Sequence, residues 1–215
     1  MSEQKRILVT GCAGFIGSHL SERLLAREQS VCGIDNLSRK GGSLNLEYLR
    51  SKQPEAFHFT ELDITNREKL ESYFKKNGPF DLIAHEAGQV AVTTSLLDPG
   101  ADFASNAAGT LHLLECIRLH SPRAKLIFAS TNKVYGNLAG VSISETETRY
   151  TLSDLPDGIP ETHPLEFHSP YGCSKGAADQ YVRDYARSFG LRTAVLRQSC
   201  IYGTRQFGLE DQGWV

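Results

Sequence analysis

The feature that most constrains this 215-residue chain is a short apolar segment followed at once by three regularly spaced glycines. Residues 7–9 read Ile-Leu-Val, which predicts a strand buried on both faces. Gly11, Gly14 and Gly17 then lead into a helix predicted over residues 15–27. Such a turn lets the backbone approach a pyrophosphate closely, and the free N–H groups at the start of the helix point at the anion. A purely structural role is the alternative, because tight turns need glycine for positive φ in any case.

Segments with strand and helix character alternate along the rest of the chain. Strands are predicted at residues 31–35, 57–62, 80–84, 125–129 and 192–196, and helices at residues 43–50 (capped by Ser43), 67–76, 98–120 and 170–189. Strands and helices that alternate at this rhythm imply right-handed βαβ crossovers. The sequence therefore predicts an α/β fold, a Rossmann-like doubly wound parallel sheet in three αβα layers.

One long segment, residues 137–169, interrupts this alternation. It is rich in Gly, Pro, Ser, Thr and Glu. Because a loop of that length inside a compact domain is usually functional, we expect it to form a long active-site loop.

Charge and cysteine pattern exclude several classes of function. With a formal net charge of −2 and scattered Lys and Arg, the chain has no basic field for nucleic acid or an anionic membrane. No apolar run is long enough to cross a bilayer, and the polar start leads straight into a strand, so we expect no secretory signal. The five cysteines lack C-x-x-C spacing, which argues against metal clusters and disulfides and favours a reducing cytoplasm.

Acidic residues follow the predicted second and third strands. Asp35 comes 18 residues after Gly17 and can accept hydrogen bonds from both ribose hydroxyls of an adenosine. Since its carboxylate would also repel a 2′-phosphate, it favours NAD over NADP. A turn or helix-capping role is the alternative for Asp35. Asp63 can meet an adenine amino group, or it can start the next helix through Thr65.

The carboxyl end of the predicted fourth strand reads His-Glu-Ala-Gly-Gln at residues 85–89. Ligands of open α/β sheets bind at this edge. We expect His85 itself to be a packed or hydrogen-bonded histidine rather than a catalyst. Asn106 and Gly109 lie inside the next predicted helix, where glycine indicates a close approach of backbone or cofactor.

Tyr171 and Lys175 form a Tyr-x-x-x-Lys pair, which a helix places on one face. A phenol is a poor base at neutral pH, but a neighbouring ammonium and the positive nicotinamide ring of NAD⁺ lower its pKa. Such a tyrosine can remove the proton of an alcohol while hydride leaves to the cofactor. Thr131, just past the fifth strand, can donate a hydrogen bond to the same oxygen. A Tyr-x-x-x-Lys pair is common by chance. Its catalytic interpretation is strengthened here because the glycine turn, Asp35 and Thr131 precede it in this order.

With these motifs the chain resembles the extended short-chain dehydrogenase/reductases, specifically the NAD-dependent nucleotide-sugar epimerases and dehydratases. The resemblance covers the whole chain. Four family motifs are present: G-x-x-G-x-x-G at Gly11, Gly14 and Gly17, H-x-A-(A/G)-Q at residues 85–89, S-(S/T)-x-x-V-Y-G at residues 130–136, and Y-x-x-x-K at Tyr171 and Lys175.

The resemblance implies a set of site residues. Thr131, Tyr171 and Lys175 would be catalytic. The residues implied to bind NAD are Gly11, Gly14, Phe15, Ile16, Gly17, Asp35, Asn36, Asp63, Ile64, Ala87, Gln89, Asn106, Tyr171 and Lys175. No metal is implied.

Within the family, residues 130–136, 167–181 and 202–215 look most similar to the 2-epimerases that act on CDP-paratose, so a nucleotide-sugar substrate is implied, with a CDP-sugar favoured. The implied mechanism has Tyr171 take the C2 hydroxyl proton while NAD⁺ takes hydride. The flat ketone then presents its other face and the hydride returns with inversion. The family's 4,6-dehydratases carry Asp-Glu after the catalytic Thr, whereas residues 132–133 here are Asn-Lys, so dehydratase chemistry lacks its acid and base.

Three departures from the family pattern stand out. Glu86 occupies a position that is usually apolar, and Cys200 and Ile201 replace an Asn pair common in other branches. Family members also continue for roughly another hundred residues beyond Val215. We therefore expect residues 1–215 to form a nearly complete NAD-binding domain that lacks most of the sugar-nucleotide-binding part, and that binds NAD without turning over substrate.

Two rival functions remain open at this point. One is a 4-epimerase or reductase acting on another nucleotide-sugar, and the other is a non-catalytic NAD-binding module. The intact Tyr171, Lys175 and Thr131 argue against the module. Because family members commonly pair through the helix holding Tyr171 and the helix ending near His120, we expect a homo-oligomer for the full-length protein.

Overall fold

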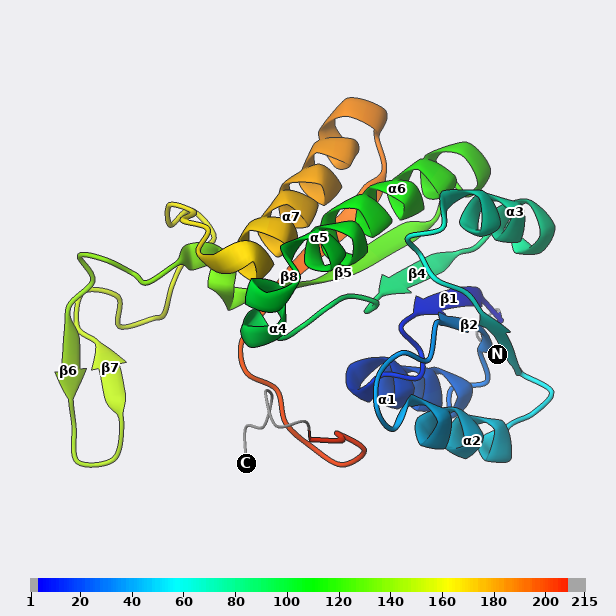
Figure 1. The fold of residues 1–215 in the computed structure, drawn as a ribbon, viewed down its shortest axis with the longest axis horizontal. Helices are drawn as coiled ribbons and strands as arrows, with labels where there is room; N and C mark the ends of the chain where they lie inside the picture. Colours follow the sequence, from blue (N-terminus) through cyan, green and yellow to red (C-terminus); the bar gives the residue numbers. More distant parts are fainter. Residues whose placement is uncertain (1–3, 209–215) are drawn as a thin grey trace.

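A parallel sheet of six strands forms the centre of the computed structural model, which describes residues 4–208 (Figure 1). The strand order is β3-β2-β1-β4-β5-β8, so the chain starts in the middle of the sheet and builds outward in both directions. All carboxyl ends therefore lie at one edge. The strands are β1 (Arg6–Thr10), β2 (Ser30–Asp35), β3 (Phe57–Glu61), β4 (Leu82–His85), β5 (Lys125–Thr131) and β8 (Arg192–Gln198).

Helices cover both faces of this sheet, which confirms the predicted doubly wound αβα arrangement (Figure 1). One face carries α1 (Phe15–Leu25) and α2 (Gly42–Lys52), and the other carries α3 (Arg67–Asn77), α6 (Gly109–His120) and α7 (Ser169–Phe189). Two short helices, α4 (Val92–Leu97) and α5 (Pro99–Phe103), lead from β4 toward α6. None of the helices in residues 4–208 is long and apolar enough to cross a membrane.

The central strand is buried on both faces, as its apolar run predicts. Ile7 and Val9 pack toward α1 and α2, whereas Leu8 packs in the cluster formed with α3, α6 and α7. Because successive side chains of a strand point to opposite faces, this run can anchor both layers at once.

The predicted helix over residues 98–120 is wrong in one respect. Asp98 does cap its start, accepting a hydrogen bond of 2.9 Å from the N–H of Ala101. However, a π-helical turn, η1 (Ala104–Ala108), separates α5 from α6, and such turns are frequent at functional sites. Gly109 follows it, and a Cβ there would lie 2.8 Å from Cδ1 of Ile64. The glycine is therefore explained by close packing against Ile64.

The cap predicted at Ser43 is also wrong. The residue before α2 is Gly41, which has a φ of +82° and no side-chain capping bond. Because glycine adopts this left-handed conformation without strain, the helix begins earlier and Ser43 lies inside it.

Residues 137–169 contain a hairpin that the sequence did not predict. Strands β6 (Ile143–Glu145) and β7 (Tyr150–Leu152) pair antiparallel and project away from the main sheet (Figure 1). The segment then returns to the sheet edge, where the N–H of Glu166 donates to the carbonyl of Val134 at 3.0 Å. Val134 belongs to a 3₁₀ turn, η2 (Asn132–Tyr135), that directly follows β5.

The face covered by α1 and α2 continues outward over β5 and β8. Register places Ile127 of β5 beside Ala84 of β4 on one side and Ala194 of β8 on the other. Ala84 packs in the cluster under α1 and α2, but Ala194 is exposed and Leu196, two residues on, is 45% exposed. This face therefore ends in an apolar, partly exposed strip at the β8 edge.

Candidate functional site

A cavity of about 850 Å³ lies at the carboxyl edge of the sheet, and residues at or just past the ends of all six strands line it. It extends from the glycine turn and Asp35 to Thr131, Tyr171 and Lys175. The structure thus brings together the motifs that the sequence separates by more than 150 residues.

Gly11 and Gly17 of the turn are each required for a different structural reason. Gly11 has a φ of +69°, and a Cβ there would lie 2.6 Å from the backbone nitrogen of Ala87. A Cβ at Gly17 would lie 2.0 Å from the carbonyl oxygen of Gly11. The positive φ of Gly11 agrees with the structural alternative, whereas at Gly17 close packing against the glycine turn requires glycine.

Gly14 differs, because it is the N-cap of α1 and no side-chain capping bond is formed there. The first N–H groups of a helix have no partner inside the helix. Gly14, Phe15, Ile16 and Gly17 all line the cavity, so this uncapped helix end opens into it. That arrangement favours an anion in the cavity.

Asp35 both shapes its turn and lines the cavity. Its Oδ1 accepts a hydrogen bond of 2.8 Å from the N–H of Leu37, and its Oδ2 accepts one of 3.0 Å from the N–H of Ala13. Burial raises the pKa of Asp35, and hydrogen bonds from backbone N–H groups oppose that rise. Asp35 therefore does stabilise the turn, as the alternative interpretation predicts. Each of its carboxylate oxygens still has a second lone pair that can accept a hydrogen bond from a ligand.

Asp63 is likewise held in a turn. It accepts hydrogen bonds of 2.8 Å from Nδ2 of Asn36 and from the N–H of Thr65, which precedes α3. Asn36, Asp63 and Ile64 all line the cavity beside Asp35. Both interpretations of Asp63 are thus compatible with its position.

Asn106 lies behind the cavity wall rather than in it, since it is 1% exposed and is not among the lining residues. Its Oδ1 accepts a hydrogen bond of 2.9 Å from the N–H of Gln89, and its Nδ2 donates to Asp102 and Ser174. Ser174 in turn donates to Asp102 at 2.5 Å. Asn106 therefore positions the wall at Gly88 and Gln89.

Sequence reasoning missed Asp102 and Ser174. Available signals were that Asp102 lies four residues before Asn106 on one helix face and that Ser174 directly precedes Lys175.

His85 is a buried, hydrogen-bonded histidine, as predicted. Its Nδ1 lies 2.7 Å from Oγ1 of Thr10, and its Nε2 lies 3.0 Å from Oγ1 of Thr110. Burial, with a smaller contribution from the charge of Lys175, lowers the pKa of His85 to about 3. The ring is therefore neutral at physiological pH.

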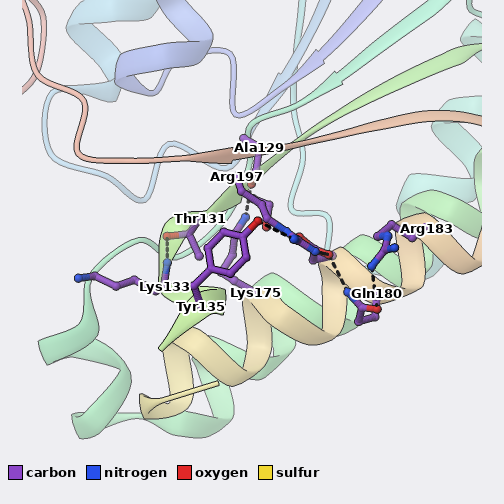
Figure 2. A network of polar contacts seen from close by, with 10 residues as sticks. Ala129, Thr131, Lys133, Tyr135, Lys175, Gln180, Arg183 and Arg197 are labelled. Atoms are coloured by element: carbon purple, nitrogen blue, oxygen red, sulfur yellow. Dashed lines mark hydrogen bonds and ion pairs between the residues drawn. The ribbon is translucent and has the colours of Figure 1, made fainter. Parts of the chain in front are cut away.

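The Tyr-x-x-x-Lys pair lies on the buried face of α7, with Tyr171 8% and Lys175 7% exposed. The N–H of Tyr171 donates to Oγ of Ser95 at 3.1 Å, which ties α7 to α4. Nζ of Lys175 donates to the carbonyl of Ala129 at 2.6 Å (Figure 2). It also lies 4.3 Å from the ring centre of Phe128. The two side chains thus reach the cavity from one helix, as their spacing predicts.

Burial reverses one expectation about the phenol. It raises the pKa of Tyr171, the charge of Asp102 raises it further, and the hydrogen bond with Thr131 opposes both. Burial also lowers the pKa of Lys175 to about 8, and the negative charges of Glu86, Asp179 and Asp102 oppose this decrease. The ammonium is turned toward the Ala129 carbonyl, so the chain's own groups keep the phenol protonated.

The end of β5 is held by a second polar network, shown in Figure 2. Arg197 of β8 donates to both carboxylate oxygens of Asp179 at 2.9 and 3.0 Å, and to the hydroxyl of Tyr135 at 2.8 Å. Ser130 also donates to Asp179 at 2.8 Å. This network holds the backbone that precedes Thr131, and the Thr131 hydroxyl itself accepts a hydrogen bond of 3.2 Å from the N–H of Lys133.

Residues 198–201 and 205–207 form the remaining wall of the cavity, which the sequence did not predict. The guanidinium of Arg205 lies 2.7 Å from the carboxylate of Glu22 on α1 and stacks 4.4 Å from the ring centre of Tyr48 on α2. Cys200, Ile201 and Phe207 also line the cavity. Residues 209–215, the end of the stretch that looked most like the CDP-sugar 2-epimerases, lie outside the described residues.

Comparison with known proteins finds relatives that include three nucleotide-sugar epimerases. A CDP-paratose 2-epimerase from Salmonella typhi is 50% identical over 210 residues, covering 98% of this chain and 61% of that protein. The UDP-glucose 4-epimerase of Thermotoga maritima, solved with UDP-glucose, has a TM-score of 0.78 at 33% identity, covering 97% of this chain and 60% of that one. The UDP-glucose 4-epimerase of Thermus thermophilus, solved with NAD, has a TM-score of 0.73 at 35% identity, covering 94% and 57%.

The chain therefore spans less than two thirds of the length of these relatives. A family model described as the NAD dependent epimerase/dehydratase family matches residues 7–214, which is nearly the whole chain. With that match, and with the same fold in two solved epimerases, the chain belongs to the NAD dependent epimerase/dehydratase family.

Proposed function

We propose that this chain is the cofactor-binding part of an NAD-dependent nucleotide-sugar epimerase that inverts C2 of CDP-paratose. The observation that carries the proposal is the convergence of Thr131, Tyr171 and Lys175 on the cavity that also holds the uncapped helix start and Asp35. The identity of 50% to a CDP-paratose 2-epimerase supports the choice of substrate.

The residues present fit a dinucleotide. The uncapped start of α1 suits a pyrophosphate. The Asp35 carboxylate, at the end of the neighbouring strand β2, suits ribose hydroxyls. A cavity of about 850 Å³ is within the range of ligand sites. Phe15, Ile16, Asn36, Asp63, Ile64, Ala87 and Gln89 would complete the binding surface, with Asn106 supporting it from behind.

When bound, NAD would supply a hydride acceptor and donor, so that the net reaction is an isomerisation. Tyr171 would accept the proton of the sugar hydroxyl and later return it, and Thr131 would donate a hydrogen bond to the same oxygen. Lys175 would hold its ammonium beside that pair from its anchor on Ala129. Because the substrate is a 3-deoxy sugar, no C3 hydroxyl can assist, so the simplest route acts at C2 itself.

We also propose that the complete protein carries a further sugar-nucleotide-binding part, and that residues 137–169 border its active site. The relatives are longer than this chain, and a doubly wound sheet normally has both faces covered. The exposed Ala194 and Leu196 mark the part of the sheet that such an extension would cover.

A second copy of the chain is proposed as a partner through α6 and α7. Exposed apolar side chains on these helices, Leu119, Tyr181 and Phe189, support this. Sedimentation of the full-length protein at several concentrations tests it, and a monomer at every concentration contradicts it.

The function is tested by mass spectrometry of the small molecule released from the purified protein, followed by turnover of CDP- and UDP-sugars by the full-length enzyme. We expect NAD to be released and CDP-paratose to be epimerised at C2. Turnover of a UDP-sugar at C4 instead would establish the 4-epimerase alternative. NAD binding without turnover of any sugar would establish the binding module.

A further inference from the structure

Glu86 places a carboxylate in the cavity at a point where neither the glycine turn nor the Tyr-x-x-x-Lys pair needs one. Its N–H donates to the carbonyl of Thr10 at 3.1 Å, so its backbone continues the alignment of β4 with β1. A Cβ at Gly11 would lie 2.9 Å from the carbonyl carbon of Glu86, which sets this residue against the glycine turn. The side chain lines the cavity, and its buried Oε2 has no hydrogen-bond partner among residues 4–208.

Three carboxylates act on the ammonium of Lys175, and two of them are already satisfied. Asp179 forms the bidentate pair with Arg197, and Asp102 accepts hydrogen bonds from Ser174 and Asn106. Glu86 is the third carboxylate. Burial raises the pKa of Glu86, and the positive charge of Lys175 opposes that rise.

Lys175 and Glu86 are therefore an ammonium and a carboxylate of this cavity that form no ion pair among the described residues, although the ammonium donates to Ala129. A buried charge costs free energy unless an opposite charge compensates it. An ammonium alone would disfavour a second positive charge nearby, and Glu86 offsets it. The oxidised nicotinamide ring is positive, whereas the reduced ring is neutral.

We propose that Glu86 is a specificity-determining residue that makes this cavity prefer the oxidised dinucleotide by compensating the charge of Lys175. The inference rests on the proposed function, because it places the nicotinamide end of the dinucleotide at the Tyr171–Lys175 side of the cavity. An epimerase that must start each cycle with the oxidised form gains from such a preference.

A different role for Glu86 makes a different prediction. If its carboxylate only accepted a hydrogen bond from a ribose hydroxyl, it would serve both redox forms equally, since the ribose is the same in each. The ratio of the two dissociation constants separates these roles, and it requires no turnover.

The experiment measures the Kd of NAD⁺ by calorimetry and that of NADH by its fluorescence, for this chain and for Glu86→Gln. Glutamine keeps the shape of the side chain and one acceptor oxygen, and it removes the charge. We expect the ratio Kd(NAD⁺)/Kd(NADH) to rise about tenfold, the size expected for loss of one charge from a partly buried cavity. Because Oε2 of Glu86 makes no hydrogen bond that the substitution would break, we expect the variant to fold.

Two further variants complete the test. Glu86→Asp keeps the charge and should keep the ratio close to that of the unchanged chain. Glu61→Gln removes an exposed carboxylate at the end of β3 that does not line the cavity, and it should leave the ratio unchanged.

Equal changes in both dissociation constants of Glu86→Gln, or an unchanged ratio, would overturn this inference alone. If the unchanged chain binds neither form, the proposed function fails, and this inference fails with it.

Discussion

Nζ of Lys175 donates a 2.6 Å hydrogen bond to the carbonyl oxygen of Ala129, which joins helix α7 to the end of strand β5. Thr131 lies two residues beyond Ala129, and Tyr171 lies one helical turn before Lys175. This bond and the hydrogen bond from Ser130 to Asp179 therefore both join the elements that carry the two hydroxyls that we propose act on the substrate.

Replacing Tyr171 by Phe removes the hydroxyl proposed to exchange a proton with the sugar. In the full-length enzyme we expect turnover to fall by about 10²–10⁴-fold. Cofactor binding should be largely kept, because the ring still fills its buried position. Steady-state kinetics and NAD titration measure the two effects. Tyr202→Phe, at a side chain 71% exposed, is the control, and unchanged turnover in Tyr171→Phe would refute the catalytic role.

Replacing Asp35 by Ala should weaken NAD binding by about 1–3 kcal/mol, the cost typical of a lost buried hydrogen-bond partner. It should also narrow the preference for NAD over NADP, because the repulsion of the 2′-phosphate is lost. Calorimetric titration with both dinucleotides measures this. Asp157→Ala, in the exposed part of residues 137–169, is the control. Equal affinity for NAD and NADP in the unchanged chain would contradict the role given to Asp35.

Replacing Gly17 by Ala forces a Cβ to within 2.0 Å of the carbonyl oxygen of Gly11. We expect the free energy of unfolding to fall by about 1–3 kcal/mol, as for other overpacked sites. Urea denaturation followed by circular dichroism measures it. Gly208→Ala is a matched control, because a Cβ there meets nothing within 4 Å. A stability equal to that of the control would show that the turn relaxes freely.

Replacing Asp179 by Asn leaves the guanidinium of Arg197 charged at a side chain only 10% exposed. Removing one partner of a buried ion pair typically costs about 3–5 kcal/mol of stability. Glu71→Gln breaks the exposed pair with Lys75, whose side chain is 61% exposed, and should cost less than about 1 kcal/mol. Denaturant titration of both variants gives the comparison, and similar losses in the two would contradict the burial argument.

The buried His85 should make the fold less stable in acid. Its pKa is lowered to about 3 in the folded chain, whereas unfolded histidine titrates near 6.5. The stability that neutral His85 contributes is complete above the unfolded pKa and is lost as the pH falls toward the folded one. We expect a loss of about 2 kcal/mol between pH 7 and pH 5 from this residue.

Urea unfolding at both pH values tests the role of His85. His85→Gln should lose most of this pH dependence, whereas His58→Gln, at an exposed position of β3, should keep it. The same slope in His85→Gln as in the unchanged chain would show that other groups cause the dependence.

Much of the fold could be predicted because its signals are local or periodic. The apolar runs ending in Asp35 and His85, and the buried face Leu70, Tyr73 and Phe74 of α3, are patterns that burial imposes on neighbouring residues. The hairpin in residues 137–169 could not be predicted, because its strands are exposed and carry little periodic burial. The close packing of Gly109 against Ile64 could not be predicted either, because the two residues are distant in sequence.

Local patterns in the amino-acid sequence were enough to predict the succession of the six main-sheet strands, the glycine turn, and the placing of Tyr171 and Lys175 on one helix face, because backbone geometry fixes each of these over a few residues. The packing of the elements set which side chains come into contact. It turned Lys175 onto Ala129, placed Asn106 behind the wall, and left Glu86 with a free oxygen in the cavity. These outcomes depend on how helices pack across the sheet, and on the burial that shifts the pKa of each group, so no local pattern contains them.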